Sequence, residues 1–170
     1  MSAQWISRRQ GMQWLGAAVA SAALPGLAQA STATTPAAKR LVSLSGALTE
    51  VVYLLHAQSL LVGTDTTSLF PEAAQKTAKV GYVRQLSAEG LLSLKPDAVI
   101  GTSDAGPPVV IEQIRQAGVR VALIAAKHNW GEVQEKVKVV GRETGRVADA
   151  DKLLAQLDAQ WSAVQAQVAK

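Results

Sequence analysis

Short apolar runs alternate along the chain with longer segments in which apolar residues return every three or four positions. The short runs predict β-strands at 41–44, 61–63, 98–100 and 119–124. The periodic segments predict α-helices at 47–55, 86–94, 107–117, 130–143 and 148–170. Strands that alternate with helices favour parallel βαβ units. The expected fold class is therefore α/β, with an open, mostly parallel sheet and flanking helices.

Local signals set the ends of several of these helices. Ser87 is a good N-cap residue for the helix at 86–94. Pro96 ends that helix, because proline disfavours helical backbone at the residue before it. Gly118 ends the next helix, as glycine does at C-terminal caps. Segment 65–79 is polar and lacks a clear period, so we expect it to be irregular.

The expected sheet places four loops where ligands usually bind. In open α/β sheets, ligands lie outside the carboxyl ends of the strands. The loops expected at that end are 43–46, 65–79, 82–86 and 103–108. The third of them lies in the stretch VGYVRQLSAEG, which carries most of the candidate chemistry.

Tyr82 and Arg84 are the candidate ligand-binding residues of this stretch. Tyrosinate is one of the few protein ligands that suit ferric haem. A guanidinium beside a phenol favours its charged form, or it binds a carboxylate with two hydrogen bonds. A ligand with a metal centre and acidic arms, such as haem, would use both residues. The residues alone also allow a half-buried ring at Tyr82 and a solvated charge at Arg84.

The first thirty residues resemble a secretory signal peptide and are not expected to belong to the fold. Arg8 and Arg9 precede an apolar stretch at 14–24, and small residues follow at 28–30. That stretch is too short for a membrane span, although an uncleaved N-terminal anchor is the alternative. The paired arginines are typical of a twin-arginine signal.

Export would place the mature chain in the periplasm. Gly11 fits the twin-arginine pattern poorly, which keeps the general secretory route open. We expect cleavage near Ala30, a tether at 31–38 and order from about Lys39. The mature piece is long enough for one domain with one core.

Composition limits the kinds of site and partner that the chain can have. The chain has no cysteine, so it has neither a disulfide framework nor a thiolate metal site. The leader holds two of the 17 Lys and Arg residues and no acid, which leaves 15 basic against 13 acidic residues. This near balance argues against a nucleic-acid partner.

An exported enzyme would need a nucleophile or general base, and the sequence offers few candidates. There is no phosphate-binding loop and no Gly-x-Ser-x-Gly motif. His56 is interpreted as a helix-end residue, whereas His128 lies in a loop from which it could reach a ligand. Two isolated histidines make a poor zinc site. Asp65, Asp104 and His128 have no evident catalytic partners, so we expect no enzyme.

Several segments resemble one family of proteins. They are RLVSLSGALTEVVYLL, LVGTDTTSLFPEAA, KVGYVRQLSAEGLLSLKPDAVI and the loop DAGPP, in that order. They are similar to the N-terminal lobe of periplasmic haem-binding proteins, the substrate-binding components of haem ABC importers. The wider superfamily includes vitamin B12 and siderophore binders, and VGYxRxLSAEG is the mark more specific to haem.

The resemblance implies roles for particular residues. Tyr82 would be the axial ligand of the haem iron, and Arg84 would contact a propionate or the tyrosinate. Glu89 would be an acidic residue that docks on the permease. Phe70 stands where relatives often have tyrosine, which leaves Tyr82 as the single obvious phenol. Tyr53, on the first helix, is interpreted as core.

The resemblance also implies two lobes joined by a long helix, with haem between them. The chain would supply an N-terminal α/β lobe at 39–147 and the start of that helix at 148–170, without the second lobe. Apolar residues continue along one face of the last helix: Leu153, Leu154, Leu157, Trp161, Val164 and Val168. This face is longer than a small lobe needs. We therefore expect an N-terminal fragment or truncated product that binds haem more weakly than a two-lobed protein.

The leading hypothesis is a non-catalytic periplasmic carrier that delivers ferric haem to an inner-membrane ABC permease. It would touch the membrane only through that permease. A corrinoid or ferric-siderophore carrier is the alternative within the same superfamily, in which Tyr82 would line the pocket without binding iron. Two hypotheses from different classes are an exported enzyme and a domain that binds no ligand.

Overall fold

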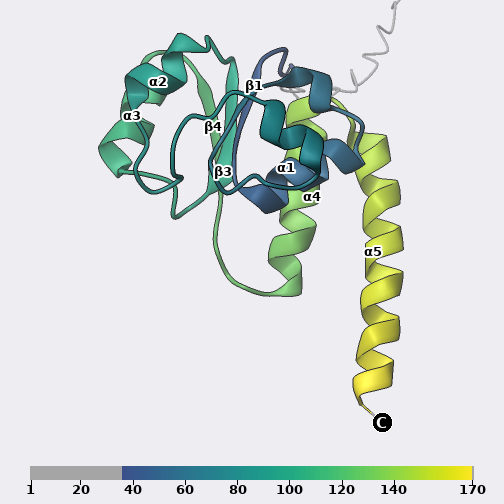
Figure 1. Ribbon diagram of the computed structural model, residues 1–170. Coiled ribbons are helices and arrows are strands. Elements are labelled where there is room, and N and C mark those ends of the chain that lie inside the picture. Colours follow the sequence, from purple (N-terminus) through teal and green to yellow (C-terminus); the bar gives the residue numbers. More distant parts are fainter. Residues whose placement is uncertain (1–35, 170) are drawn as a thin grey trace, which may run out of the picture. The chain divides into compact units, whose positions relative to one another are not determined.

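The computed structural model describes residues 36–169 (Figure 1). Its strands are β1 (Leu41–Leu44), β2 (Leu61–Thr64), β3 (Ala98–Thr102) and β4 (Arg120–Ile124). Its α-helices are α1 (Gly46–Leu54), α2 (Ala88–Ser93), α3 (Pro108–Gln116), α4 (Trp130–Thr144) and α5 (Val147–Val168). The predicted signal peptide and residues 31–35 of the predicted tether lie outside the described residues.

The four strands form one parallel sheet in the order β2-β1-β3-β4. Leu41 of β1 lies beside Leu61 on one side and Ala98 on the other. Because every pair is parallel, the carboxyl ends of all four strands emerge at the same end of the sheet. The predicted open parallel sheet with flanking helices is thus confirmed.

Helices cover both faces of this sheet. Figure 1 shows α2 and α3 on one side and α1, α4 and α5 on the other. Side chains of β1 and β3 alternate between the two faces: Leu41 and Ile100 join the cluster under α1 and α4, and Val42 and Val99 join the cluster under α2 and α3. Burial on both faces explains why these strands read as continuous apolar runs.

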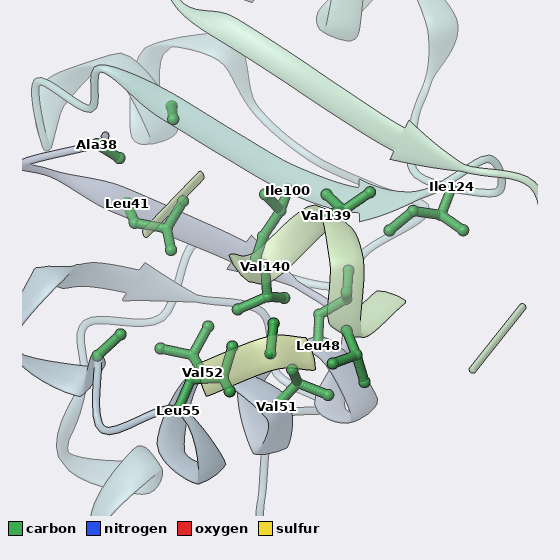
Figure 2. Close-up of a cluster of buried hydrophobic side chains, with 14 of the residues drawn as sticks. Ala38, Leu41, Leu48, Val51, Val52, Leu55, Ile100, Ile124, Val139 and Val140 are labelled. Atoms are coloured by element: carbon green, nitrogen blue, oxygen red, sulfur yellow. The ribbon is translucent and has the colours of Figure 1, made fainter. Parts of the chain in front are cut away.

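The core under α1 and α4 is built from tightly enclosed aliphatic side chains (Figure 2). Leu48, Val52 and Val140 are each fully buried there, and each such burial contributes about 1.5–3 kcal/mol. Tyr53 is half-buried rather than a member of this core. Ala38, which falls in the predicted tether, is buried in this core, and its backbone N–H donates to the carbonyl oxygen of Glu143 at 2.6 Å.

Helices α4 and α5 are joined by a tight turn. Gly145 caps α4 with a φ of 70°, which glycine adopts without strain. Gly141 allows the close approach of α5, because a Cβ there would lie 2.5 Å from the Cβ of Ala150. The start of α5 is packed, but Val164 is 49% and Val168 is 82% exposed. The apolar face of α5 thus becomes exposed toward the end of the helix.

Two short 3-10 helices were missed by the sequence pattern. One (Gln58–Leu60) precedes β2, and the other (Glu72–Lys76) lies in the segment expected to be irregular. Lys79 holds the second, because its Nζ donates to the carbonyl oxygens of Ser68 and Ala74 at 3.0 and 3.2 Å. A backbone-bonding side chain of this kind leaves no periodic signal. Among the described helices, none combines the length and the apolar character needed to cross a membrane.

Candidate functional site

The candidate site lies at the carboxyl ends of the parallel strands. We call this end of the sheet the rim and define it by three segments: 79–86, 103–107 and 125–129. The last two follow β3 and β4 directly. Segment 79–86 lies beside the end of β2. Lys79 and Thr64 form an isolated parallel β-bridge, and the N–H of Val80 donates to the carbonyl oxygen of Thr64 at 3.0 Å.

The segment that carries Tyr82 is anchored by apolar side chains. Val80, Val83 and Leu86 are all buried in the cluster under α2 and α3. Between these anchors, Tyr82 is 44% exposed, and the side chain of Arg84 is 62% exposed. The alternation of buried and exposed residues therefore presents the phenol and the guanidinium on the surface of the rim.

Backbone hydrogen bonds tie this segment to the loop after β3. Gly106 donates its N–H to the carbonyl oxygen of Val83 and accepts from the N–H of Leu86, both at 2.9 Å. The N–H of Gln85 donates to the carbonyl oxygen of Tyr82 at 2.8 Å and closes a turn. Backbone hydrogen bonds thus hold the segment of Tyr82 against the loop after β3.

Arg84 reaches Asp104 of the neighbouring loop. Its guanidinium contacts the Oδ2 of Asp104 at 3.0 Å, and the Oγ1 of Thr102 donates to the Oδ1 of the same carboxylate. The hydrogen bond from Thr102, aided by Arg84, lowers the pKa of Asp104 against the opposing effect of burial. The sequence suggested the phenol or a ligand carboxylate as the partner of Arg84. In the structure, the guanidinium of Arg84 instead pairs with the carboxylate of Asp104 in the same chain.

Two exposed apolar side chains lie in the loop after β2. Leu69 is 61% and Phe70 is 66% exposed. The same loop starts beside the Tyr82 segment, because the N–H of Thr66 donates to the carbonyl oxygen of Gly81 at 3.0 Å. The sequence singled out Phe70 for its substitution and gave no sign that Leu69 is exposed with it. Such side chains offer an apolar surface to a flat ligand.

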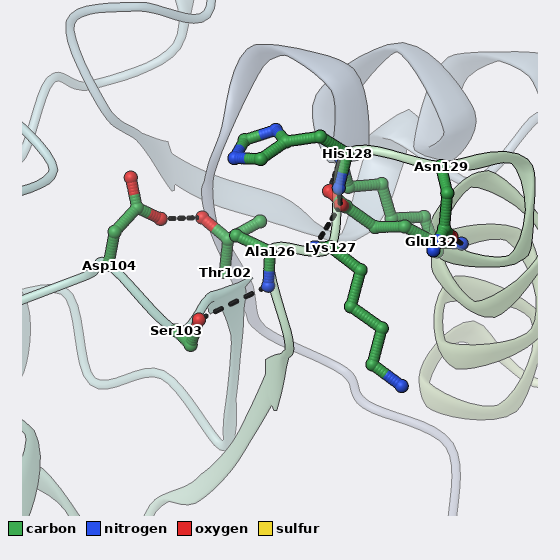
Figure 3. Close-up of polar contacts among 9 residues, drawn as sticks. Thr102, Ser103, Asp104, Ala126, Lys127, His128, Asn129 and Glu132 are labelled. Atoms are coloured by element: carbon green, nitrogen blue, oxygen red, sulfur yellow. Dashed lines mark hydrogen bonds and ion pairs between the residues drawn. The ribbon is translucent and has the colours of Figure 1, made fainter.

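The third segment of the rim carries His128, and a buried carboxylate holds it (Figure 3). The Oε2 of Glu132 accepts from the backbone N–H groups of Lys127 and His128, each at 2.6 Å. Its Oε1 pairs with the Nζ of Lys136, also at 2.6 Å. The ion pair with Lys136, followed by the two backbone bonds, lowers the pKa of Glu132 to about 2 despite its burial.

The sequence placed His128 in a loop that could reach a ligand, but it did not name segment 125–129 among the four ligand-binding loops and it missed the role of Glu132. A signal was available, since Asn129 followed three residues later by an acid is the pattern of a helix N-terminus. Asn129 does cap α4, and its Oδ1 accepts from the N–H of Glu132 at 3.0 Å. The Glu132 side chain, however, turns back to the preceding loop, which the pattern does not foretell.

The candidate catalytic residues Asp65, Asp104 and His128 each have other surroundings. The carboxylate of Asp65 is buried and accepts from Ser68 at 2.7 Å and from the N–H and hydroxyl of Thr67. Asp104 is occupied by Arg84, and His128 is exposed on another loop. Within residues 36–169, no three His, Asp or Glu side chains gather closely enough to hold a metal ion.

Two further features lie outside the rim segments proper. Glu89 is exposed in the first turn of α2, where an acid also suits the positive end of the helix. Trp130 and Trp161 stack with their ring centres 5.0 Å apart. A hollow of about 590 Å³ lies beside this pair and is bounded by His128 and Val133, among others. No residue of segment 79–86 lines it.

Comparison with known proteins gives a consistent result. The periplasmic binding protein family matches residues 41–170. Among solved structures, the periplasmic haem-binding protein BhuT in complex with two haems has a TM-score of 0.74 and 38% identity, over 79% of this chain and 51% of that one. A periplasmic haem-binding protein from Pseudomonas aeruginosa has a TM-score of 0.67 and 43% identity, over 73% of this chain and 44% of that one. The resemblance read from the sequence is confirmed.

Curated relatives broaden the picture. An uncharacterized ABC transporter substrate-binding lipoprotein of Bacillus subtilis, YvrC, is 29% identical over 75% of this chain and 41% of its own length. The vitamin B12-binding protein of Vibrio vulnificus is 30% identical over 49% of this chain and 30% of its own length. The chain thus spans about half the length of the solved neighbours and less of these curated relatives. These proteins are binding proteins by name.

Proposed function

Because the chain belongs to the periplasmic binding protein family, we propose that it binds ferric haem for delivery to an inner-membrane ABC permease. The predicted leader supports export to the periplasm, where such a carrier works. The solved neighbours that bind haem support haem as the ligand. Delivery, partner and location belong to the whole protein, of which this chain would supply the N-terminal lobe.

One observation carries the proposal: Tyr82 is 44% exposed on a rim segment whose backbone is held by hydrogen bonds. An exposed phenol on a held backbone can meet the iron of an incoming porphyrin without rearrangement of the main chain. Tyrosinate suits ferric haem as an axial ligand. Leu69 and Phe70 add apolar surface, which favours burial of a porphyrin face.

Arg84 and Glu89 have charged partners in this proposal. Arg84 exchanges the carboxylate of Asp104 for a haem propionate, an exchange of like for like that costs little at an exposed pair. Glu89, exposed on α2, docks on basic residues of the permease, where complementary charge guides association.

A corrinoid carrier is the second candidate, since the vitamin B12-binding protein of Vibrio vulnificus is a relative. In that case Tyr82 would line the pocket, and no iron–phenolate bond would form. The two candidates differ in what they predict for the visible spectrum.

The test is a titration of the full chain with hemin, followed by visible absorbance. We expect a ferric–tyrosinate band in the wild type and its loss in Tyr82→Phe. Tyr53→Phe is the matched control, because Tyr53 is the only other tyrosine and lies half-buried on α1. It should leave the band unchanged.

An unchanged band in Tyr82→Phe would refute Tyr82 as the iron ligand. A wild type that ignores hemin but binds cyanocobalamin would replace the haem proposal with the corrinoid one. Turnover of a substrate, lost in His128→Ala, would point to an enzyme instead.

A further inference from the structure

His128 has a strained backbone on an exposed loop. Its φ is 53°, in the left-handed region that residues with a Cβ rarely adopt. Such backbone persists only where the surrounding structure imposes it, and it gathers at functional sites. The contacts that hold the backbone at His128 therefore bear on what this residue does.

The carboxylate of Glu132 holds the backbone at His128. It is buried, and its Oε2 accepts from the N–H groups of both Lys127 and His128 at 2.6 Å. Hydrogen bonds from backbone N–H groups to an ionised carboxylate are among the strong ones in proteins. Lys136 neutralises the other carboxylate oxygen. One side chain thus fixes the backbone that presents the imidazole.

The imidazole of His128 lies on a loop that contacts the loop of Asp104. The N–H of Ala126 donates to the Oγ of Ser103 at 3.2 Å, which brings the loop of His128 beside the loop of Asp104. Figure 3 shows the His128 ring turned toward the side where Asp104 lies, whereas Lys127 extends away from it. The hydrogen-bonded loops therefore place His128, Asp104 and Arg84 on one continuous rim.

We infer that His128 is a ligand-contacting residue of this rim, which donates a hydrogen bond from its imidazole to a carboxylate of the ligand, and that Glu132 is its positioning residue. The inference rests on the proposed function, since it concerns the same ligand. With Arg84, which pairs with Asp104 of the neighbouring loop, the rim then presents two donors, and two donors suit a ligand with two carboxylate arms. Specificity for the acidic arms is thereby separated from the bond between iron and Tyr82.

The test compares hemin with hemin dimethyl ester, which keeps the porphyrin and the iron but has no free carboxylate. In His128→Ala we expect the affinity of the full chain for hemin to fall about tenfold, the size expected of one hydrogen bond to a charged group. Affinity for the dimethyl ester should not change. His56→Ala is the matched control, because His56 is also exposed with a φ of 53° but follows α1.

The positioning role of Glu132 is tested by comparing the binding of hemin and of its dimethyl ester, because a purely structural effect would weaken both alike. Glu132→Gln should weaken hemin binding in the wild-type background and have no further effect in His128→Ala, and binding of the ester should stay the same in both. Thermal melting of each variant shows that it remains folded. A loss of affinity for both ligands alike would assign Glu132 a structural role only and overturn its positioning role.

The outcomes separate this inference from the proposed function. A Tyr82-dependent band with equal hemin affinity in the wild type and His128→Ala would overturn the inference and leave the proposed function standing. Absence of the Tyr82-dependent band in the wild type would overturn both.

Discussion

The two loops that carry Tyr82 and His128 belong to the same rim but are held in opposite ways. The Tyr82 segment is fixed by backbone hydrogen bonds to Gly106 and by buried apolar side chains such as Val83 and Leu86. In the His128 loop, two successive backbone N–H groups donate to the buried carboxylate of Glu132. In the first loop the charged residues are exposed, and in the second the charge is buried.

Charged residues can therefore be changed without loss of stability near Tyr82, but not near His128. Removing a surface charge near Tyr82 leaves the backbone bonds in place, so its chemistry can change without loss of the fold. Removing the charge of Glu132 leaves Lys136 without its counter-ion and weakens the hydrogen bonds from two backbone N–H groups, and breaking a buried charged pair is costly. The conformation of the His128 loop therefore depends on the ionised carboxylate of Glu132.

The largest effect is expected from Glu132→Gln. The variant should lower the free energy of unfolding by about 2 kcal/mol, since it removes charged hydrogen bonds from a buried site. Urea denaturation measures this change. Hydrogen exchange should accelerate at the amides of Lys127 and His128, whereas the amide of Leu86 should keep its protection.

Glu135→Gln is the matched control for that variant. Glu135 lies on the same helix, but its side chain is 47% exposed and it pairs with Arg142 at the surface. Its loss should cost well under 1 kcal/mol. Equal destabilisation by the two variants would remove the proposed distinction between buried and exposed charge.

A smaller effect is expected from acid. The pKa of Glu132 is about 2 in the folded chain, against an ordinary value of 4.5. Because the folded-state pKa is depressed, the stability from Glu132 is fully present above pH 4.5 and is lost as the pH falls toward 2. The difference in unfolding free energy between the wild type and Glu132→Gln should therefore shrink over that range. A difference that stays constant down to a pH of about 2 would contradict this account.

Much of the fold could be predicted from local patterns. Strands such as β3 read as apolar runs because both of their faces are buried, and Ser87 marks the start of α2, where its Oγ accepts from the N–H of Gly90. Signals of this kind depend on neighbours within a few residues. The 3-10 helix Glu72–Lys76 has no such signal, since Lys79 holds it from outside.

The candidate site was less accessible to prediction. Tyr82 could be picked out because its type and its place near a strand end point to ligand binding. The contact between Arg84 and Asp104 joins residues twenty positions apart, and only the fold brings them together. The hydrogen bond from the N–H of His128 likewise depends on the Glu132 side chain turning back on its own loop. Such contacts are properties of the tertiary structure.

The smallest effect is expected from Arg84→Gln, and it tests the Tyr82 side of the comparison. The pair of Arg84 with Asp104 is exposed, and exposed pairs are typically worth about 0.2–1 kcal/mol. The unfolding free energy should change by no more than that, as in the control Arg115→Gln, which breaks the exposed pair with Glu112. Amide protection at Leu86 should persist, because its bond to Gly106 does not involve the guanidinium. Loss of that protection would mean that the charged pair, and not the backbone, holds Tyr82 in place, and the exchange of Asp104 for a ligand carboxylate would then disturb the phenol it is meant to assist.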